Sequence, residues 1–177
     1  MTRVVASLAA LLCSAALLAA PAAADTGTVA DPAGDSSVGP EGPGLDITGA
    51  TFDNGARRLV VTVSFEELHR GDLVVSVAPR GGDGVRLISY YRPGTRASSF
   101  VATGSFDDLE RGRVDCARFH VEWDRQAATA RLTMPPRCLA HAEYGELRFV
   151  VLTEVEGGDT DDAPGARAGH TRWIARG

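Results

Sequence analysis

The sequence predicts an all-β protein, a jelly-roll-like antiparallel β-sandwich of two sheets with eight or nine strands. Two observations lead to this fold class. Short runs of alternating apolar and polar residues recur from Leu45 onward, with turn residues between them. Outside the N-terminal segment, no stretch longer than a turn or two repeats its apolar residues with the period of a helix. Removing the first 24 of the 177 residues leaves 153, which is enough for a single domain over residues 45–177 preceded by a short arm.

The first strands are predicted around the dipeptide Asn54-Gly55, which is typical of a tight β-hairpin. This turn joins residues 46–52 to residues 58–65, where Leu59, Val61, Val63 and Phe65 share one face. Three more strands are predicted over residues 73–77, 85–91 and 98–105.

A second hairpin is predicted from residues 119–123 and 130–134, with Trp123 on the apolar side of its strand. Cys116 and Cys138 flank this hairpin, and we expect them to form a disulfide that closes its open end. The alternative, a redox or metal-binding pair, commonly has Cys-x-x-Cys spacing, which is absent here.

Residues 147–155 form the longest predicted strand, and residues 171–176 form the last one. Helix is expected to be close to nil, apart from turns near residues 106–111 and 139–144. The alternation pattern therefore accounts for the whole domain without a helical layer.

The first 24 residues have the features of a secretory signal peptide. Arg3 precedes an apolar run over residues 4–20, and Pro21 and three alanines follow it, so that Asp25 becomes the new N-terminus. The run is slightly short for a membrane span, which disfavours an uncleaved anchor. We expect a secreted protein, extracellular or associated with the cell wall, with no membrane span after cleavage.

Residues 25–44 are rich in Gly, Pro and Asp without apolar periodicity, which predicts an irregular arm. The net charge of −5 becomes −6 once Arg3 is removed, so the chain has no basic field for nucleic acid. The chain has no lysine, which excludes catalysis through a lysine Schiff base.

The arm contains an Asp-Pro-x-Gly-Asp motif at residues 31–35, a glycine-rich bend at 42–44 and Asp-Ile-Thr at 46–48. This opening resembles the start of β-sandwich domains of the family-nine carbohydrate-binding and DOMON-like group. The resemblance covers about twenty residues and implies a structural calcium ion held by three aspartates: Asp31, Asp35 and Asp46.

A second acidic segment, at residues 156–162, contributes the candidate calcium ligands Asp159 and Asp161. Because chain termini often lie close together in one domain, both segments can share an ion. Two solvated turns without a metal are the simpler interpretation of the same residues.

Exposed aromatic rings can stack on sugars, and Trp173, Tyr90 and Tyr91 are the candidates for ligand binding. We therefore expect a non-catalytic binding module, with polysaccharide or a cell-surface protein as its ligand. One alternative is a protein–protein interaction module, such as a cell-wall adaptor or a protease inhibitor. The other is a hydrolase whose two carboxylates leave no signature in the sequence.

Overall fold

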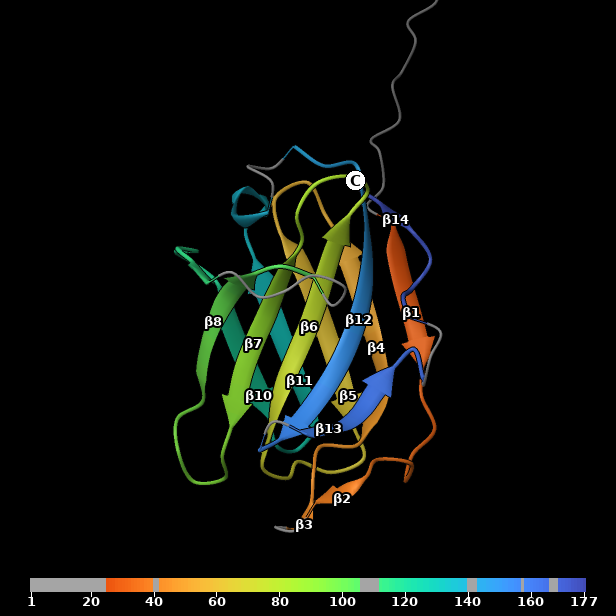
Figure 1. Cartoon of the computed structure of the whole chain (residues 1–177), viewed down its shortest axis with the longest axis vertical. Coiled ribbons are helices and arrows are strands. Elements are labelled where there is room, and N and C mark those ends of the chain that lie inside the picture. The colour runs from red at the N-terminus through yellow and green to blue at the C-terminus, as the bar shows by residue number, and fades with distance from the viewer. Residues whose placement is uncertain (1–24, 40–41, 106–111, 140–142, 157, 166–168) are drawn as a thin grey trace, which may run out of the picture.

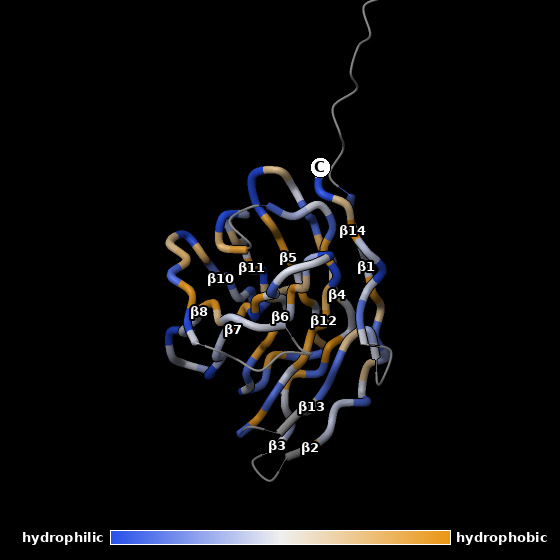
Figure 2. The backbone as a smooth tube through the Cα atoms, turned by 45° about the horizontal axis from the view of Figure 1, so that its top comes forward, coloured by the Kyte–Doolittle hydropathy of each residue, from blue (hydrophilic) through white to orange (hydrophobic). Residues whose placement is uncertain are grey.

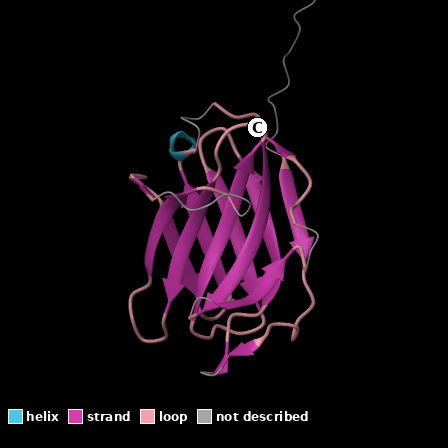
Figure 3. Ribbon diagram, in the orientation of Figure 1, coloured by secondary structure: helices cyan, strands magenta, loops and turns pink. Residues whose placement is uncertain are grey.

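The computed structural model, described over residues 25–39, 42–105, 112–139, 143–156, 158–165 and 169–177, contains two antiparallel β-sheets packed face to face (Figure 1). The predicted β-sandwich is therefore confirmed. Figure 3 shows that strands form both layers of the described fold and that loops connect them, with one short 3₁₀ turn, η1 (Pro136–Cys138). No described helix is long and apolar enough to cross a lipid bilayer.

The first sheet has five strands in the order β1-β4-β5-β11-β10. Their bounds are Thr26–Ala30 (β1), Ile47–Asn54 (β4), Leu59–Phe65 (β5), Thr129–Met134 (β11) and His120–Asp124 (β10).

The second sheet has the strand order β13-β12-β6-β7-β8-β9, and β14 also pairs with β12. Its strands are Gly158–Ala163 (β13), Glu146–Val155 (β12), Gly71–Pro79 (β6), Val85–Tyr91 (β7), Ser98–Thr103 (β8), Arg113–Val114 (β9) and Ile174–Ala175 (β14). A separate two-stranded ribbon is formed by Val38–Gly39 (β2) and Gly42–Pro43 (β3).

The core lies between the two sheets, because alternate residues of each strand face inward. Phe52 of β4 and Phe149 of β12 stack across the core with ring centroids 4.5 Å apart. Trp123 packs against Phe65 and Tyr91, as its place on the apolar side of β10 predicts. Figure 2 shows hydrophobic residues concentrated on central strands such as β5 and β12, with hydrophilic residues on the connecting loops.

Two segments differ from the sequence prediction. The arm over residues 25–44 is not irregular throughout, because residues 26–30 form β1 and pair with β4 from Thr26↔Asp53 to Ala30↔Gly49. Residues 158–163 form β13 beside β12 and not a loop. Both are edge strands, and neither Thr-Gly-Thr-Val-Ala nor the aspartate-rich β13 alternates apolar and polar residues. Backbone pairing in the folded protein therefore decides their structure.

The nine strands predicted from residue 46 onward are all present, although the last is shorter than expected, at Ile174–Ala175. The turn predicted at 106–111 lies outside the described residues, as do residues 140–142 of the other predicted turn.

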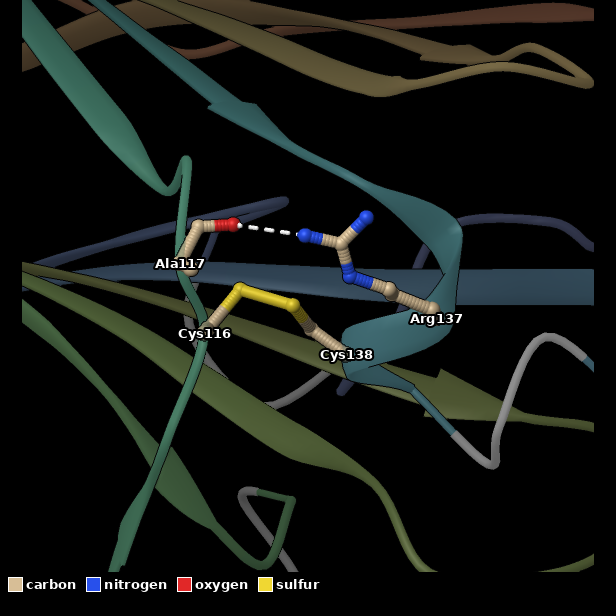
Figure 4. The surroundings of a disulfide bond; sticks show 4 residues. All are labelled: Cys116, Ala117, Arg137 and Cys138. Carbon is tan, nitrogen blue, oxygen red and sulfur yellow. Dashed lines mark hydrogen bonds between the residues drawn. A yellow bond between two sulfur atoms is a disulfide. The ribbon is translucent and has the colours of Figure 1, made fainter.

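The predicted disulfide is confirmed. Cys116 and Cys138 are joined, with their Cα atoms 5.5 Å apart, and the bridge links the segment before β10 to η1 after β11 (Figure 4). Beside it, Arg137 Nη2 donates a hydrogen bond of 3.2 Å to the carbonyl of Ala117 (Figure 4). The bridge therefore closes the open end of the β10–β11 hairpin.

Candidate functional site

A cluster of aspartates lies at the edge of the sandwich where the two sheets meet. Asp31 follows β1 directly, Asp35 lies in the loop after it, and Asp161 belongs to β13 of the opposite sheet. One carboxylate oxygen from each of these three residues lies within 4.8 Å of the others. The fold thus brings together Asp31 and Asp161, which belong to different acidic segments and lie 130 positions apart in the sequence.

Asp161 connects the two sheets. Its Oδ2 accepts a hydrogen bond of 2.6 Å from the backbone N–H of Ile47 in β4, and its Oδ1 accepts one of 2.8 Å from the N–H of Asp162. A second cross-sheet bond lies nearby, from Thr153 Oγ1 in β12 to the carbonyl of Leu45, at 2.9 Å. These bonds hold β13 and β12 against the start of β4.

Asp46, just before β4, is 6% exposed and holds the loop after β1 in place. Its Oδ2 accepts a hydrogen bond of 2.6 Å from the backbone N–H of Gly34. Its backbone carbonyl accepts another, of 2.9 Å, from the N–H of Glu66. Asp46 therefore lies beside the three clustered aspartates and connects their loop to the segment after β5.

Asp31 has the least favourable environment in the cluster. It is 8% exposed, and neither carboxylate oxygen has a hydrogen-bond partner among the described residues. Burial, followed by the negative charges of Asp161, Asp35, Asp162 and Asp46, raises the pKa of Asp31 to about 6.

The pKa of Asp161 is raised as well. Burial raises its pKa to about 6, although the backbone hydrogen bonds from Ile47 and Asp162 act against the increase. That both pKa values are raised indicates that no described residue supplies a compensating positive charge at this site.

The donor set determines which group fits this site. All the clustered side chains are carboxylates, which are hard oxygen ligands suited to Ca²⁺ or Mg²⁺ and poorly suited to softer metals. Ca²⁺ takes six to eight oxygens in a flexible geometry, and loops can supply backbone carbonyls in addition to carboxylates. Asp31, Asp35 and Asp161 would supply carboxylate ligands, with Asp46 beside them.

Of the predicted calcium ligands, the structure groups Asp31, Asp35 and Asp161 and places Asp46 next to them. Asp159 belongs to β13, where a register shift pairs it with Glu154 while Asp161 pairs with the adjacent Thr153. The side chain of Asp159 lies outside the described structure.

Sequence reasoning did not identify Glu66 as a neighbour of Asp46. The register of the predicted hairpin could have identified it. Ile47 pairs with Phe65 at the end of the hairpin away from the turn, so Asp46, before Ile47, lies next to Glu66, after Phe65. A bulge in that register near Ile47 accompanies this arrangement.

A groove of about 330 Å³ lies beside the aspartate cluster, and Gly34 and Asp46 are among the residues that line it. Asp46, Glu66 and Glu67 make it acidic, and a hydrogen bond to Asp46 raises the pKa of Glu66. His69 at its rim lies 3.5 Å from Glu67, measured from Nε2 to Oε2.

The three candidate aromatic residues are dispersed. Tyr91 lies in the core at 5% exposure, and the ring of Tyr90 packs edge-on against Phe100 on the outer face of the second sheet. The guanidinium groups of Arg80 and Arg148 lie 4.7 and 5.2 Å from the centre of the Trp173 ring. The described structure therefore does not bring these rings together as one platform, and sugar stacking stays a prediction.

The fold and the acidic cluster together define the class of protein: an antiparallel β-sandwich with a disulfide and a group of carboxylates joining the edges of its two sheets. Comparison with known proteins finds no matching family model, no matching curated protein and no matching solved structure.

Proposed function

We propose that this protein is a secreted, non-catalytic binding module whose sandwich edge is stabilised by a calcium ion. The observation that carries the proposal is the carboxylate of Asp31, which is buried among four other aspartates and accepts no hydrogen bond from any described residue. A buried charge without a partner is costly, and a divalent cation at this position removes the cost.

The location of the cluster supports a structural role for the ion. Asp31 and Asp35 belong to the N-terminal arm, whereas Asp161 belongs to the second sheet, so an ion shared by them links both sheets to the arm. Secretion is supported by the sequence features of residues 1–24, and the disulfide is compatible with an extracellular location.

Calorimetric unfolding of residues 25–177 under non-reducing conditions tests this function. Calcium at 100 times its Kd should stabilise the native state by about 2.7 kcal/mol and raise Tm by about 5 to 10 °C. Asp31→Asn should remove the increase, whereas Asp83→Asn, an equal loss of charge in the exposed turn before β7, should retain it. An unchanged Tm on addition of calcium to the unsubstituted chain would reject the proposal.

A hydrolase remains the second candidate, because Asp46 and Glu66 both line the groove. A carboxyl group whose pKa is raised by a neighbouring carboxylate is suited to act as a general acid. Release of reducing ends from soluble polysaccharides, lost in Glu66→Gln, would establish this activity. Binding of the same polysaccharides without cleavage would favour the binding module.

A further inference from the structure

Gly165, two residues after the end of β13, lies against the carboxylate of Asp31. A Cβ atom added at this glycine would lie 3.2 Å from Asp31 Oδ1 and 4.0 Å from the backbone carbonyl oxygen of Asp162. The first distance is shorter than an ordinary van der Waals contact, so a side chain here would press on the carboxylate. The absence of a side chain therefore leaves room beside two oxygen atoms of the acidic segments.

The backbone conformation does not require glycine at this position. Gly165 is not one of the glycines with a positive φ angle, so an L-amino acid can adopt its backbone conformation. What restricts the residue is the close approach to Asp31. Glycine is the usual residue where the backbone must come close to a ligand.

The carboxylate that Gly165 approaches is directed into the aspartate cluster. Asp31 is 8% exposed, and neither of its carboxylate oxygens has a hydrogen-bond partner among the described residues. One of these oxygens lies within 4.8 Å of carboxylate oxygens of Asp35 and Asp161. Both Asp31 oxygens are almost inaccessible to solvent, so this side of the cluster is dry.

We infer that Gly165 sets the size of the cation site and that the site selects Ca²⁺ over Mg²⁺. Mg²⁺ usually keeps several of its waters, whereas Ca²⁺ binds six to eight oxygens, including carboxylates and backbone carbonyls. A cluster that excludes water on the Asp31 side therefore favours Ca²⁺, and the carbonyl of Asp162 is a further oxygen ligand. The inference rests on the proposed calcium-binding function, and it adds the ion selectivity and the residue that sets it.

The tolerance of a calcium site makes this position sensitive. A methyl group at residue 165 would have to push the Asp31 carboxylate away by a few tenths of an ångström. Calcium–oxygen distances range over about 2.3 to 2.6 Å, so a displacement of this size covers the whole accepted range. The largest ion should be affected most, because it has the least room to adjust.

Isothermal titration calorimetry of residues 25–177 at neutral pH, after treatment with a chelator, tests the inference. The titrants are the chlorides of Mg²⁺, Ca²⁺ and Sr²⁺, in order of increasing ionic radius. We expect the unsubstituted chain to bind Ca²⁺ at least about tenfold more tightly than Mg²⁺. Gly165→Ala should weaken Ca²⁺ binding about tenfold and Sr²⁺ binding by a larger factor.

The matched control is Gly145→Ala. Gly145 is exposed, its φ angle is not positive, and a Cβ atom there would meet no atom within 4 Å. This variant adds the same methyl group and restricts the unfolded chain in the same way, so it should bind all three ions as the unsubstituted chain does.

Three results would overturn the inference: Mg²⁺ binding as tight as Ca²⁺ binding, unchanged affinities in Gly165→Ala, or an equal loss for Ca²⁺ and Sr²⁺, which indicates general distortion. If Gly165→Ala does not fold, the ion series on the unsubstituted chain decides, and a preference for Ca²⁺ supports the inference. An unsubstituted chain that binds none of the ions rejects the proposed function as well. Tight Ca²⁺ binding that Gly165→Ala leaves unchanged rejects the role of Gly165 alone.

Discussion

Asp31 has the least favourable electrostatic environment of the residues in the candidate site. Its carboxylate is 8% exposed, without a hydrogen-bond partner in the described structure, and it lies beside Asp35 and Asp161. A buried carboxylate beside other carboxylates destabilises the folded protein when no cation is present. The same carboxylate stabilises the folded protein when it binds a cation. The sign of a substitution at Asp31 therefore depends on calcium.

We expect Asp31→Asn to stabilise the calcium-free protein by about 1 to 2 kcal/mol, because it removes a buried charge that its neighbours repel. In saturating calcium the same variant should be less stable than the unsubstituted protein, because it loses a ligand. Urea unfolding with and without a chelator measures both effects. A variant that is destabilised equally in both conditions would contradict this prediction.

The stability of the calcium-free protein should depend on pH through Asp31 and Asp161. Their pKa values rise from 3.8 to about 6 on folding, so between those pH values the native state binds more protons than the unfolded chain. The free energy of unfolding therefore falls as pH rises from about 4 to 6, and this contribution is constant above that window.

Calcium should reverse that trend, because protons compete with the ion for the same carboxylates. The stabilisation by calcium should grow as pH rises from about 4 to 6.5. Thermal unfolding at half-unit pH intervals, with calcium or with a chelator, checks both slopes. A calcium-free curve that instead rises across the window would show that the clustered carboxylates are not the dominant titrating groups.

At the scale of elements, β1 pairs with β4 and packs against β14. Gly27 is buried in this strand, and a Cβ atom there would collide with the side chain of Ile174 in β14. The neighbouring Thr28 is exposed, so its side chain has room to change.

Gly27→Val should therefore cost about 1 to 3 kcal/mol of stability through overpacking. Thr28→Val should change it by less than about 0.5 kcal/mol. Denaturant unfolding of both variants is the measurement. Equal, negligible effects would mean that β1 is not docked on the sheet in solution.

The Cys116–Cys138 bridge closes a loop with a sequence separation of 22 residues. In the chain-entropy model such a loop contributes about 3 kcal/mol by restricting the unfolded state. The paired substitution Cys116→Ala/Cys138→Ala should lower the free energy of unfolding by about that amount. It should leave calcium stabilisation in place, since neither cysteine belongs to the aspartate cluster. A loss below about 1 kcal/mol would contradict the entropic estimate.

At the scale of the whole molecule, the two sheets bury the main core between them, and β1 and β13 lie at the same edge of the sandwich (Figure 1). The clustered aspartates Asp31, Asp35 and Asp161 lie at this edge. The N-terminal arm takes part in both features through β1 and Asp31. Signal-peptide cleavage before Asp25, as the sequence predicts, would leave this arm intact.

We therefore expect a secreting host to release a chain that begins at Asp25. Intact-mass measurement and N-terminal sequencing of the exported protein check this prediction. Cleavage beyond Asp31 would remove a candidate calcium ligand and β1 together, and such a product should lose the Tm increase on addition of calcium.

Much of the fold was predictable because its physical causes are local. Alternation of apolar residues, as in Leu59, Val61 and Val63, depends on the two-residue period of a strand, and Asn54-Gly55 specifies a tight hairpin through its own backbone preferences. The disulfide was predicted from the two cysteines that remain once the expected signal peptide, which contains Cys13, is removed.

The edge strands were not predictable in this way. Neither segment alternates apolar and polar residues: β1 reads Thr-Gly-Thr-Val-Ala, and β13 is rich in Asp, which is depleted in strands. Both become strands by pairing with β4 and β12. Glu66 meets Asp46 through the register of the β4–β5 hairpin, in which a bulge near Ile47 shifts the pairing.

The sequence by itself determined the all-β class, the central strands, the disulfide and the identity of the acidic residues, since each depends on residue type and short-range spacing. Only the tertiary structure decided that Asp31, Asp35 and Asp161 meet, and that Asp159 and Asp161 pair with adjacent residues of β12. The reason is physical: the distance between residues 130 positions apart is set by sheet packing and by register shifts, and neither is encoded in local spacing.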